Sequence, residues 1–197
     1  MRTVYEAGRQ LRKLRFLMLL MPALGIACVA YGIDIMKTYG LRPADGGVLK
    51  PLHVRLAFGG GMGLVGLGAT AGMALYSRRY VARLELDDTT GEVHLLTPGL
   101  FGVRRLVLRR DDFGRGRYYH GRFEAGYRRV NAPWWTMPVR GYRIPFLLDA
   151  QGVVRDHRAV GSLLRLRGAD VELLRAQSST AMTSAASHKR KPARRRG

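Results

Sequence analysis

The sequence contains few side chains whose type and spacing could support catalysis. None of the five histidines forms a recognised metal-ligand motif with another His, Cys or acid. They are His53, His94, His120, His157 and His188. The neighbours Asp111 and Asp112 would point to opposite faces of a strand, so we interpret them as part of a turn. Gly114-Arg115-Gly116 has the composition of a phosphate loop, but no Lys-Ser/Thr follows it and no strand–helix frame surrounds it. We therefore expect no catalytic residue, no metal site and no catalytic cofactor.

The segment from Arg110 to Asn131 is better suited to binding than to catalysis. It interleaves arginine with aromatic residues, and its candidate contacts are Arg115, Arg117, Tyr118, Tyr119, Arg122, Phe123, Tyr127, Arg128 and Arg129. This composition is typical of surfaces for single-stranded nucleic acid, where arginine contacts phosphate and rings stack on bases. The alternative is a long loop on a membrane or a partner subunit, with its arginines on lipid phosphates. Two apolar stretches earlier in the chain favour that alternative.

The overall charge indicates a polyanionic partner. The 197 residues include 34 Lys and Arg against 14 Asp and Glu, a formal net charge of +20. Nucleic acid, anionic lipid and an acidic protein face all fit this charge. Each basic residue near an anionic membrane contributes about 1 kcal/mol to binding. We expect contacts to anionic lipid or to a partner at Arg12, Lys13, Arg15, Arg78, Arg79, Lys189, Arg190, Lys191, Arg194, Arg195 and Arg196.

Two uncharged stretches are long enough to cross a membrane. Phe16–Ile33 has 18 uncharged residues, near the lower limit, and Leu56–Ser77 has 22. Because a helix rises about 1.5 Å per residue, about 20 apolar residues cross a hydrocarbon core about 30 Å thick. The basic segment 1–15 has features of a mitochondrial transit peptide and, with the first apolar run, of a secretory signal. We favour a basic juxtamembrane helix, because the apolar run follows at once and no clean cleavage site precedes Asp34.

Glycine is the most distinctive residue of the second stretch. Seven of its 22 residues are glycine, and in water each would cost a helix about 1 kcal/mol relative to alanine. In lipid the backbone must satisfy its own hydrogen bonds, so the helix is retained. The pairs Gly59/Gly63 and Gly68/Gly72 are spaced four apart and leave flat strips for close packing. We expect this interface to hold the partner span of the same chain, with a helix of another protein as the alternative.

Charge predicts that the two ends of this hairpin lie on one side of the membrane. Asp34–Arg55, between the spans, contains Pro43 and the Asp45-Gly46-Gly47 turn, so we interpret it as a loop. Its charges are mixed, whereas both outer flanks of the hairpin are one-sidedly basic. By the positive-inside rule, both termini then face the side on which the protein is synthesised.

After the spans, the pattern predicts a small antiparallel β domain with a C-terminal helix. Residues 82–87 alternate apolar and charged with period two, and short strands separated by turn residues continue to residue 148. Asp156 is suited to cap a helix over residues 157–167, and a second helical piece follows over 169–176. The fold class is therefore that of an α+β membrane protein. It consists of a basic segment 1–15, a hairpin 16–77, a β domain 78–176 and a basic tail 177–197 of disordered composition.

Several short strings lie at spacings found in a known family. They are Ser77-Arg78-Arg79-Tyr80-Val81, Phe101-Gly102, Met137-Pro138-Val139-Arg140-Gly141-Tyr142-Arg143, Phe146-Leu147-Leu148-Asp149, Gly152 and Val160-Gly161. With them, residues 16–165 resemble the mitochondrial inner-membrane TMEM proteins, in which a two-helix hairpin precedes a small matrix β domain. The resemblance implies an inner-membrane protein with both termini in the matrix. The basic tail and the Arg/Tyr-rich segment are not part of the family pattern.

The same resemblance implies binding rather than catalysis. It implies a non-catalytic accessory subunit or assembly factor of a respiratory-chain complex, with cytochrome c oxidase first, and it brings no catalytic residues. Bound phospholipid such as cardiolipin fits the basic residues near the membrane. The alternative function is a membrane anchor or translation factor that binds the mitochondrial ribosome or a messenger RNA through its basic segments.

Overall fold

The computed structural model describes residues 1–41, 46–125 and 128–176, and for 122–125 and 128–131 it describes the backbone alone. The chain divides into two compact units, Lys13–Arg78 on the one hand and Met1–Arg12 with Arg79–Gly197 on the other. The predicted fold class is confirmed: two long apolar helices pack together, and antiparallel sheets and short C-terminal helices follow.

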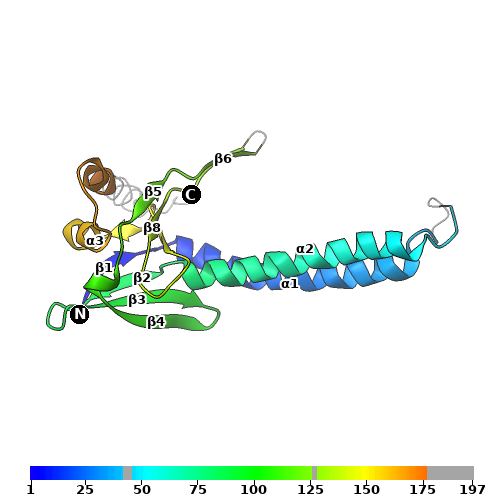
Figure 1. The fold of residues 1–197 in the computed structure, drawn as a ribbon, viewed down its shortest axis with the longest axis horizontal. Coiled ribbons are helices and arrows are strands. Elements are labelled where there is room, and N and C mark those ends of the chain that lie inside the picture. Colours follow the sequence, from blue (N-terminus) through cyan, green and yellow to red (C-terminus); the bar gives the residue numbers. More distant parts are fainter. Residues whose placement is uncertain (42–45, 126–127, 177–197) are drawn as a thin grey trace, which may run out of the picture. The chain divides into compact units, whose positions relative to one another are not determined.

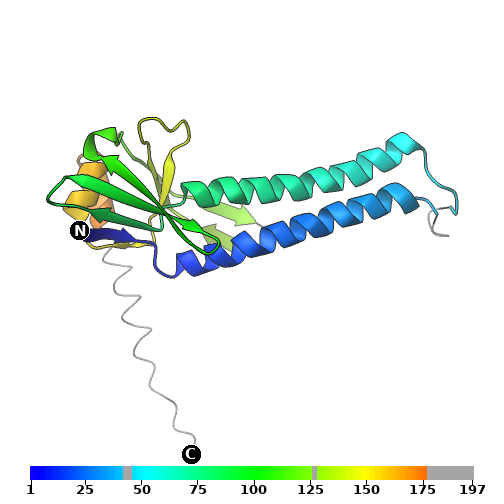
Figure 2. The same ribbon diagram turned by 90° about the horizontal axis from the view of Figure 1, so that it is seen from below.

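Two long helices form the first unit (Figure 1, Figure 2). Helix α1 spans Gln10–Thr38 and helix α2 spans Leu52–Arg79, so the stretches 16–33 and 56–77 lie within them. By length and composition, each helix is long and apolar enough to cross a membrane. Their apolar side chains are mostly exposed, and Ile26 and Leu64 each reach 72%. Exposed apolar surface of this extent suits a lipid environment, since in water it costs free energy in proportion to its area.

Arg55, in the first turn of α2, closes the hairpin. Its Nη1 donates to the carbonyl oxygen of Met36 at 2.6 Å, and its Nε donates to that of Lys50 at 2.9 Å. The Met36 carbonyl belongs to the last turn of α1, where carbonyls lack an intrahelical donor and a cation is favoured by the helix dipole. The predicted loop residues Pro43 and Asp45 lie outside the described residues.

A five-stranded antiparallel sheet organises the second unit. Its order is β10-β1-β2-β3-β4. The strands are β1 (Arg2–Glu6), β2 (Arg83–Leu86), β3 (Glu92–Gly99), β4 (Gly102–Arg109) and β10 (Val153–Val154). On one face, Leu84 pairs with Leu95 and Leu86 pairs with Val93, and all four side chains are buried. The alternation predicted over 82–87 therefore reflects one buried face of this sheet.

A second antiparallel sheet and the C-terminal helices complete the unit. Strands β5 (Arg117–Tyr119), β8 (Trp134–Met137) and β9 (Phe146–Asp149) form it in the order β5-β8-β9, and β6 (Arg122–Ala125) pairs separately with β7 (Arg128–Asn131). Helix α3 spans His157–Leu163, and residues 169–176 are also helical. The core holds buried side chains from both sheets and from α3, among them Trp135, Met137, Phe146, Leu148, Leu84, Leu95 and Val160.

Two predicted elements are shorter in the structure than in the sequence pattern. Helix α3 stops before Arg165, which adopts a positive φ of 49° that a continuing helix does not allow. Of the short strands predicted up to residue 148, the last one reads from the sequence as Tyr142–Leu148 but enters the sheet only at Phe146. Pro145 precedes that point and has no N–H to donate to a neighbouring strand.

The largest difference concerns the N-terminal segment. The sequence predicts a juxtamembrane helix over residues 1–15, and this prediction is wrong for Arg2–Glu6, which form strand β1. Strand β1 pairs with β2 on one side and β10 on the other, and Val4 and Tyr5 are completely buried. β-Branched and aromatic residues favour a strand where both faces are covered. A transit peptide that included these residues would remove a strand from inside the sheet.

Tyr5 links β1 to the turn that follows β9. Its hydroxyl donates to the carbonyl oxygen of Asp149 at 3.0 Å, and a Cβ at Gly152 would lie 2.5 Å from Cε2 of the Tyr5 ring. Only glycine leaves room for the ring at this turn, so the Ala150-Gln151-Gly152 turn and β1 fit one another.

Replacing Tyr5 tests whether β1 belongs to the folded core. We expect Tyr5→Ala to lower the free energy of unfolding by about 3–5 kcal/mol, the usual range when a large buried side chain becomes alanine. Thermal melting of the full chain in detergent, followed by near-UV circular dichroism, measures this. Thr3→Ala, a partly exposed neighbour on the same strand, is the control. Equal melting of both variants and the wild type would contradict a buried β1.

Candidate functional site

Four glycines bring α1 and α2 into close contact. Gly25 lies against Gly66, and Gly32 lies against Gly59. A Cβ at Gly66 would lie 2.8 Å from the carbonyl oxygen of Gly25 and 2.7 Å from Cβ of Cys28, and a Cβ at Gly32 would overlap the Gly59 carbonyl oxygen. The two glycines on each helix are seven residues apart, so the contact recurs every second turn on one face. Larger residues here would push the helices apart.

The predicted packing residues divide between two faces of α2. Gly59 lies in the contact with α1. At Gly63, Gly68 and Gly72, an added Cβ would meet no described atom within 4 Å. Their assignment to a helix interface stays a prediction, and it now concerns a helix from outside this chain. Sequence spacing of four favoured these glycines, whereas the observed contact has a spacing of seven and includes Gly66.

The two described tyrosines of the Arg/aromatic segment, Tyr118 and Tyr119, pack on aromatic rings of the same domain. Tyr118 lies opposite Trp135 on β8, with ring centroids 5.0 Å apart. Tyr119 stacks on Trp134, with centroids 5.7 Å apart and an interplanar angle of 12°. These are cross-strand aromatic pairs, which stabilise a sheet. Tyr119 nevertheless stays 44% exposed.

The arginines of this segment are only partly described. Arg115 and Arg117 are exposed, while the side chains of Arg122, Arg128 and Arg129 lie outside the described part, as do Phe123 and Tyr127. The backbone of strands β6 and β7, which contain Arg122, Arg128 and Arg129, pairs antiparallel. The described rings do not form an open surface on which bases could stack, because Tyr118 packs against Trp135 and Tyr119 packs against Trp134.

The cations predicted near the membrane lie where the two helices meet the sheet-bearing unit in sequence. Arg12, Lys13, Arg15 and Arg78 are exposed. Arg79 differs, because its guanidinium lies 5.1 Å from the ring centroid of Tyr142 and 5.2 Å from that of Phe146. Such a contact is a cation–π interaction, which holds the charge in a fixed position. The tail cations lie outside the described residues: Lys189, Arg190, Lys191, Arg194, Arg195 and Arg196.

A groove of about 780 Å³ lies beside β1, β10 and α3. Its charged lining consists of five arginines and two carboxylates: Arg2, Arg83, Arg155, Arg158, Arg175, Glu6 and Asp156. The excess of positive charge suits an anionic group. Sequence reasoning did not find this groove, because it combines β1 with segments more than 75 residues away.

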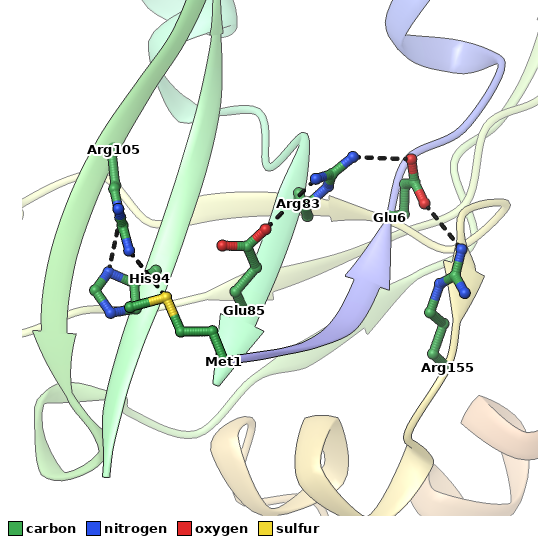
Figure 3. Close-up of polar contacts among 7 residues, drawn as sticks. All are labelled: Met1, Glu6, Arg83, Glu85, His94, Arg105 and Arg155. Atoms are coloured by element: carbon green, nitrogen blue, oxygen red, sulfur yellow. Dashed lines mark hydrogen bonds and ion pairs between the residues drawn. The ribbon is translucent and has the colours of Figure 1, made fainter. Parts of the chain in front are cut away.

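Ion pairs hold several of these arginines in place (Figure 3). Glu6 lies between two of them, with one carboxylate oxygen 3.3 Å from Arg83 and the other 3.3 Å from Arg155. Arg83 also lies 3.4 Å from Glu85. All these side chains are partly exposed, so each pair contributes little to stability. Their effect is to orient the guanidinium groups along the groove.

His94, on strand β3 of the same sheet, is buried and hydrogen-bonded to a neighbouring strand. Nδ1 of His94 accepts a hydrogen bond from Nε of Arg105 at 2.9 Å, and Nη2 of Arg105 contacts Sδ of Met1 at 3.2 Å (Figure 3). Nε2 of His94 lies 4.0 Å from the Glu92 carboxylate. Among the described residues, no group of three or more His, Cys, Asp or Glu could hold a metal ion.

Two carboxyl groups have lowered pKa values, and both stabilise local structure. The pKa of Asp156 lies below its ordinary value because the carboxylate accepts the backbone N–H of Ala159 and lies near Arg2. This is the N-cap of α3. The hydroxyl and backbone N–H of Thr89 lower the pKa of Asp87 to about 2 in the β2–β3 turn.

We expect Gly66→Leu to separate α1 from α2. The leucine side chain would clash with the backbone of Gly25, and overpacking of this kind lowers the free energy of unfolding by about 1–3 kcal/mol. Thermal melting of the helical circular dichroism of the full chain in mild detergent measures the loss. Gly68→Leu, two residues away on the open face of α2, is the matched control. Equal losses in the two variants would contradict the observed contact face.

The cap at Asp156 makes stability depend on pH. Since the folded pKa is lowered, the stabilisation is fully present above the unfolded pKa of about 3.9 and is lost as pH falls through the folded pKa. We expect Asp156→Ala to cost about 1 kcal/mol at neutral pH and much less at the lowest pH at which the protein stays folded. Melting curves at both pH values test this, with Asp156→Asn as a control that keeps a capping oxygen. A cost of Asp156→Ala that does not change with pH would contradict the prediction.

Comparison with known proteins supports one assignment. The model of the TMEM70/TMEM186/TMEM223 protein family matches residues 44–163, more than half of the chain. The match contains α2, both sheets except β1, and α3. The comparison with curated proteins found no match, and neither did the comparison with solved structures. This chain belongs to the TMEM70/TMEM186/TMEM223 protein family.

Proposed function

We propose that the protein is a non-catalytic accessory subunit or assembly factor of a respiratory-chain complex in the mitochondrial inner membrane. The observation that carries the proposal is the family match over residues 44–163. This family is mitochondrial, is associated with respiratory complex assembly, and consists generally of non-catalytic assembly factors. A hairpin anchor joined to a folded β domain suits a protein that holds other subunits near the membrane.

The sheet supports a hairpin topology. Strand β1 directly precedes α1 and strand β2 directly follows α2, and the two pair with one another. If both helices cross the membrane, the pairing requires that both outer ends emerge on the same side. The exposed cations Arg12, Lys13, Arg15 and Arg78 at these ends favour the matrix side.

Within the family, we propose the TMEM223 branch and cytochrome c oxidase as the complex. The strings around Met137–Arg143 support this assignment. Anionic lipid such as cardiolipin fits the cations at the helix ends, and the groove lined by Arg83, Arg155 and Arg158 suits an acidic segment of a partner subunit.

The alternative is an anchor for the mitochondrial ribosome or a messenger RNA. The exposed Arg115 and Arg117, and the cations of the tail, favour it. Against it, Tyr118 and Tyr119 pack on tryptophans of the same sheet. Stacking on bases requires free ring faces, so the described aromatic residues support this function less than their composition does.

We expect cells that lack this protein to lose assembled cytochrome c oxidase while their mitochondrial ribosomes sediment normally. Native gels and sucrose gradients measure the two quantities. The full chain should restore the complex. A chain without residues 177–197 should restore most of it, because the hairpin and β domain remain to bind.

A variant with the six tail cations replaced by glutamine controls for tail length. RNA binding by these cations would fall steeply with rising salt, because each neutralised phosphate releases a counterion. Ribosome association that survives detergent and disappears with both tail variants would overturn the accessory-subunit proposal in favour of the ribosome anchor.

A further inference from the structure

The connection between β8 and β9 contains a run of exposed residues. Residues 140–144, Arg-Gly-Tyr-Arg-Ile, are all exposed, with Tyr142 at 37% and Ile144 at 41%. Val139 and Phe146 on either side are buried. We call this run the 140–144 turn. An exposed tyrosine, an isoleucine and two arginines within five residues need an environment that accepts both apolar and cationic groups.

The 140–144 turn is held in a defined conformation. The N–H of Arg140 donates to the carbonyl oxygen of Asp112 at 2.7 Å, and the N–H of Tyr142 donates to that of Val139 at 3.1 Å. Gly141 adopts a positive φ of 84°, which glycine allows without strain. The exposed side chains therefore project from a fixed turn.

Arg79 connects this turn to the end of α2. Its guanidinium lies over the rings of Tyr142 and Phe146 at 5.1 and 5.2 Å, and the two rings contact each other at 5.2 Å. The Arg79 Nε is buried and has no hydrogen-bond partner among the described residues, so the rings stabilise the cation. Arg79 is the last residue of α2. If α2 crosses the membrane, a turn that contacts its last residue lies next to the end of the span.

The composition of the turn suits the membrane interface at the end of a span. Tyrosine and arginine are favoured at membrane interfaces, where the aromatic ring and the aliphatic stem lie among acyl chains and the polar ends stay among headgroups. Guanidinium groups bind phosphate through paired hydrogen bonds. The sequence has no acidic residue between Glu124 and Asp149, so no neighbouring carboxylate along the chain offsets Arg140 and Arg143.

We propose that the 140–144 turn is a second lipid-contacting element. It places Tyr142 and Ile144 in the membrane interface and binds anionic phospholipid headgroups through Arg140 and Arg143. The proposal rests on the proposed function in one respect, namely that α2 crosses the membrane. It adds to the family assignment a specific ligand class and the residues that bind it.

Lipid quenching of single labels tests the position of the turn. The full chain, with Cys28→Ser, carries one cysteine at Ile144, Leu67 or Thr90, labelled with an environment-sensitive fluorophore and reconstituted in phosphatidylcholine vesicles with or without cardiolipin. Nitroxide lipids labelled near the headgroup quench labels at the interface, and nitroxide lipids labelled near the end of the acyl chain quench labels at the centre of the bilayer. Leu67 is exposed within α2 and Thr90 is exposed in the β2–β3 turn. We expect the headgroup-level quencher to act at Ile144, the acyl-chain quencher to act at Leu67, and neither to act at Thr90.

Paired substitutions test the headgroup contact. Each basic residue near an anionic surface contributes about 1 kcal/mol, so we expect Arg140→Gln with Arg143→Gln to weaken half-saturation by a fluorescent cardiolipin analogue roughly 30-fold. Arg104→Gln with Arg109→Gln changes the net charge equally at two exposed arginines of β4 and should have little effect. Arg140→Lys with Arg143→Lys keeps the charge and should retain most of the binding. Melting curves verify that each variant is folded.

The outcomes separate this proposal from the proposed function. Quenching at Leu67 without quenching at Ile144 would overturn the lipid contact of the turn and leave the membrane anchor intact. No quenching at Leu67 would overturn the membrane-spanning assignment, and with it the proposed function. Equal cardiolipin binding by the Arg140/Arg143 glutamine pair and the wild type would overturn the headgroup contact, even with a label at Ile144 that is quenched.

Discussion

The pairing of β1 with β2 is the constraint on which the rest of the structure depends. It joins the segment before α1 to the segment after α2, with Thr3 opposite Glu85 and Glu6 opposite Arg83. Because this pairing lies inside a five-stranded sheet, both ends of the hairpin are bound into one domain. The glycine contact between α1 and α2 and the Arg55 bonds at the hairpin turn then hold the helices along their length.

The sequence was most informative where one local pattern determines the structure. Charge-free length identified α1 and α2, and period-two alternation identified β2. It failed where distant segments decide. The basic residues around Val4 and Tyr5 resemble a membrane flank, but burial between β2 and β10 makes these residues a strand. Glycine spacing located α2 as a packing helix, yet the face that it uses depends on Gly25 and Gly32 of the other helix.

The candidate sites show the same contrast between local patterns and distant contacts. The sequence locates the cations, but it does not show which distant residues they contact. Arg79 contacts two rings more than 60 residues away, and Arg83 contacts Glu6, 77 residues before it in the chain. Some of the 34 Lys and Arg side chains therefore make contacts that stabilise the fold of the domain. Other cations, among them Arg78, Arg140 and Arg143, stay exposed to the surroundings, and these are the ones to which we assign contacts with anionic lipid or partner subunits.

The position of β1 also affects how the protein is made. During synthesis β1 emerges first, but its partner β2 starts only at Arg83, after both helices, and the Tyr5 hydroxyl binds Asp149, 144 residues away. Loop closure over such separations is slow, and partly formed sheets expose edges that aggregate. The N-terminal strand therefore stays unpaired with β2 until both helices have been synthesised. If the two helices insert into a membrane as a hairpin, their insertion brings β1 and β2 together, and folding of the β domain is then linked to arrival at the membrane.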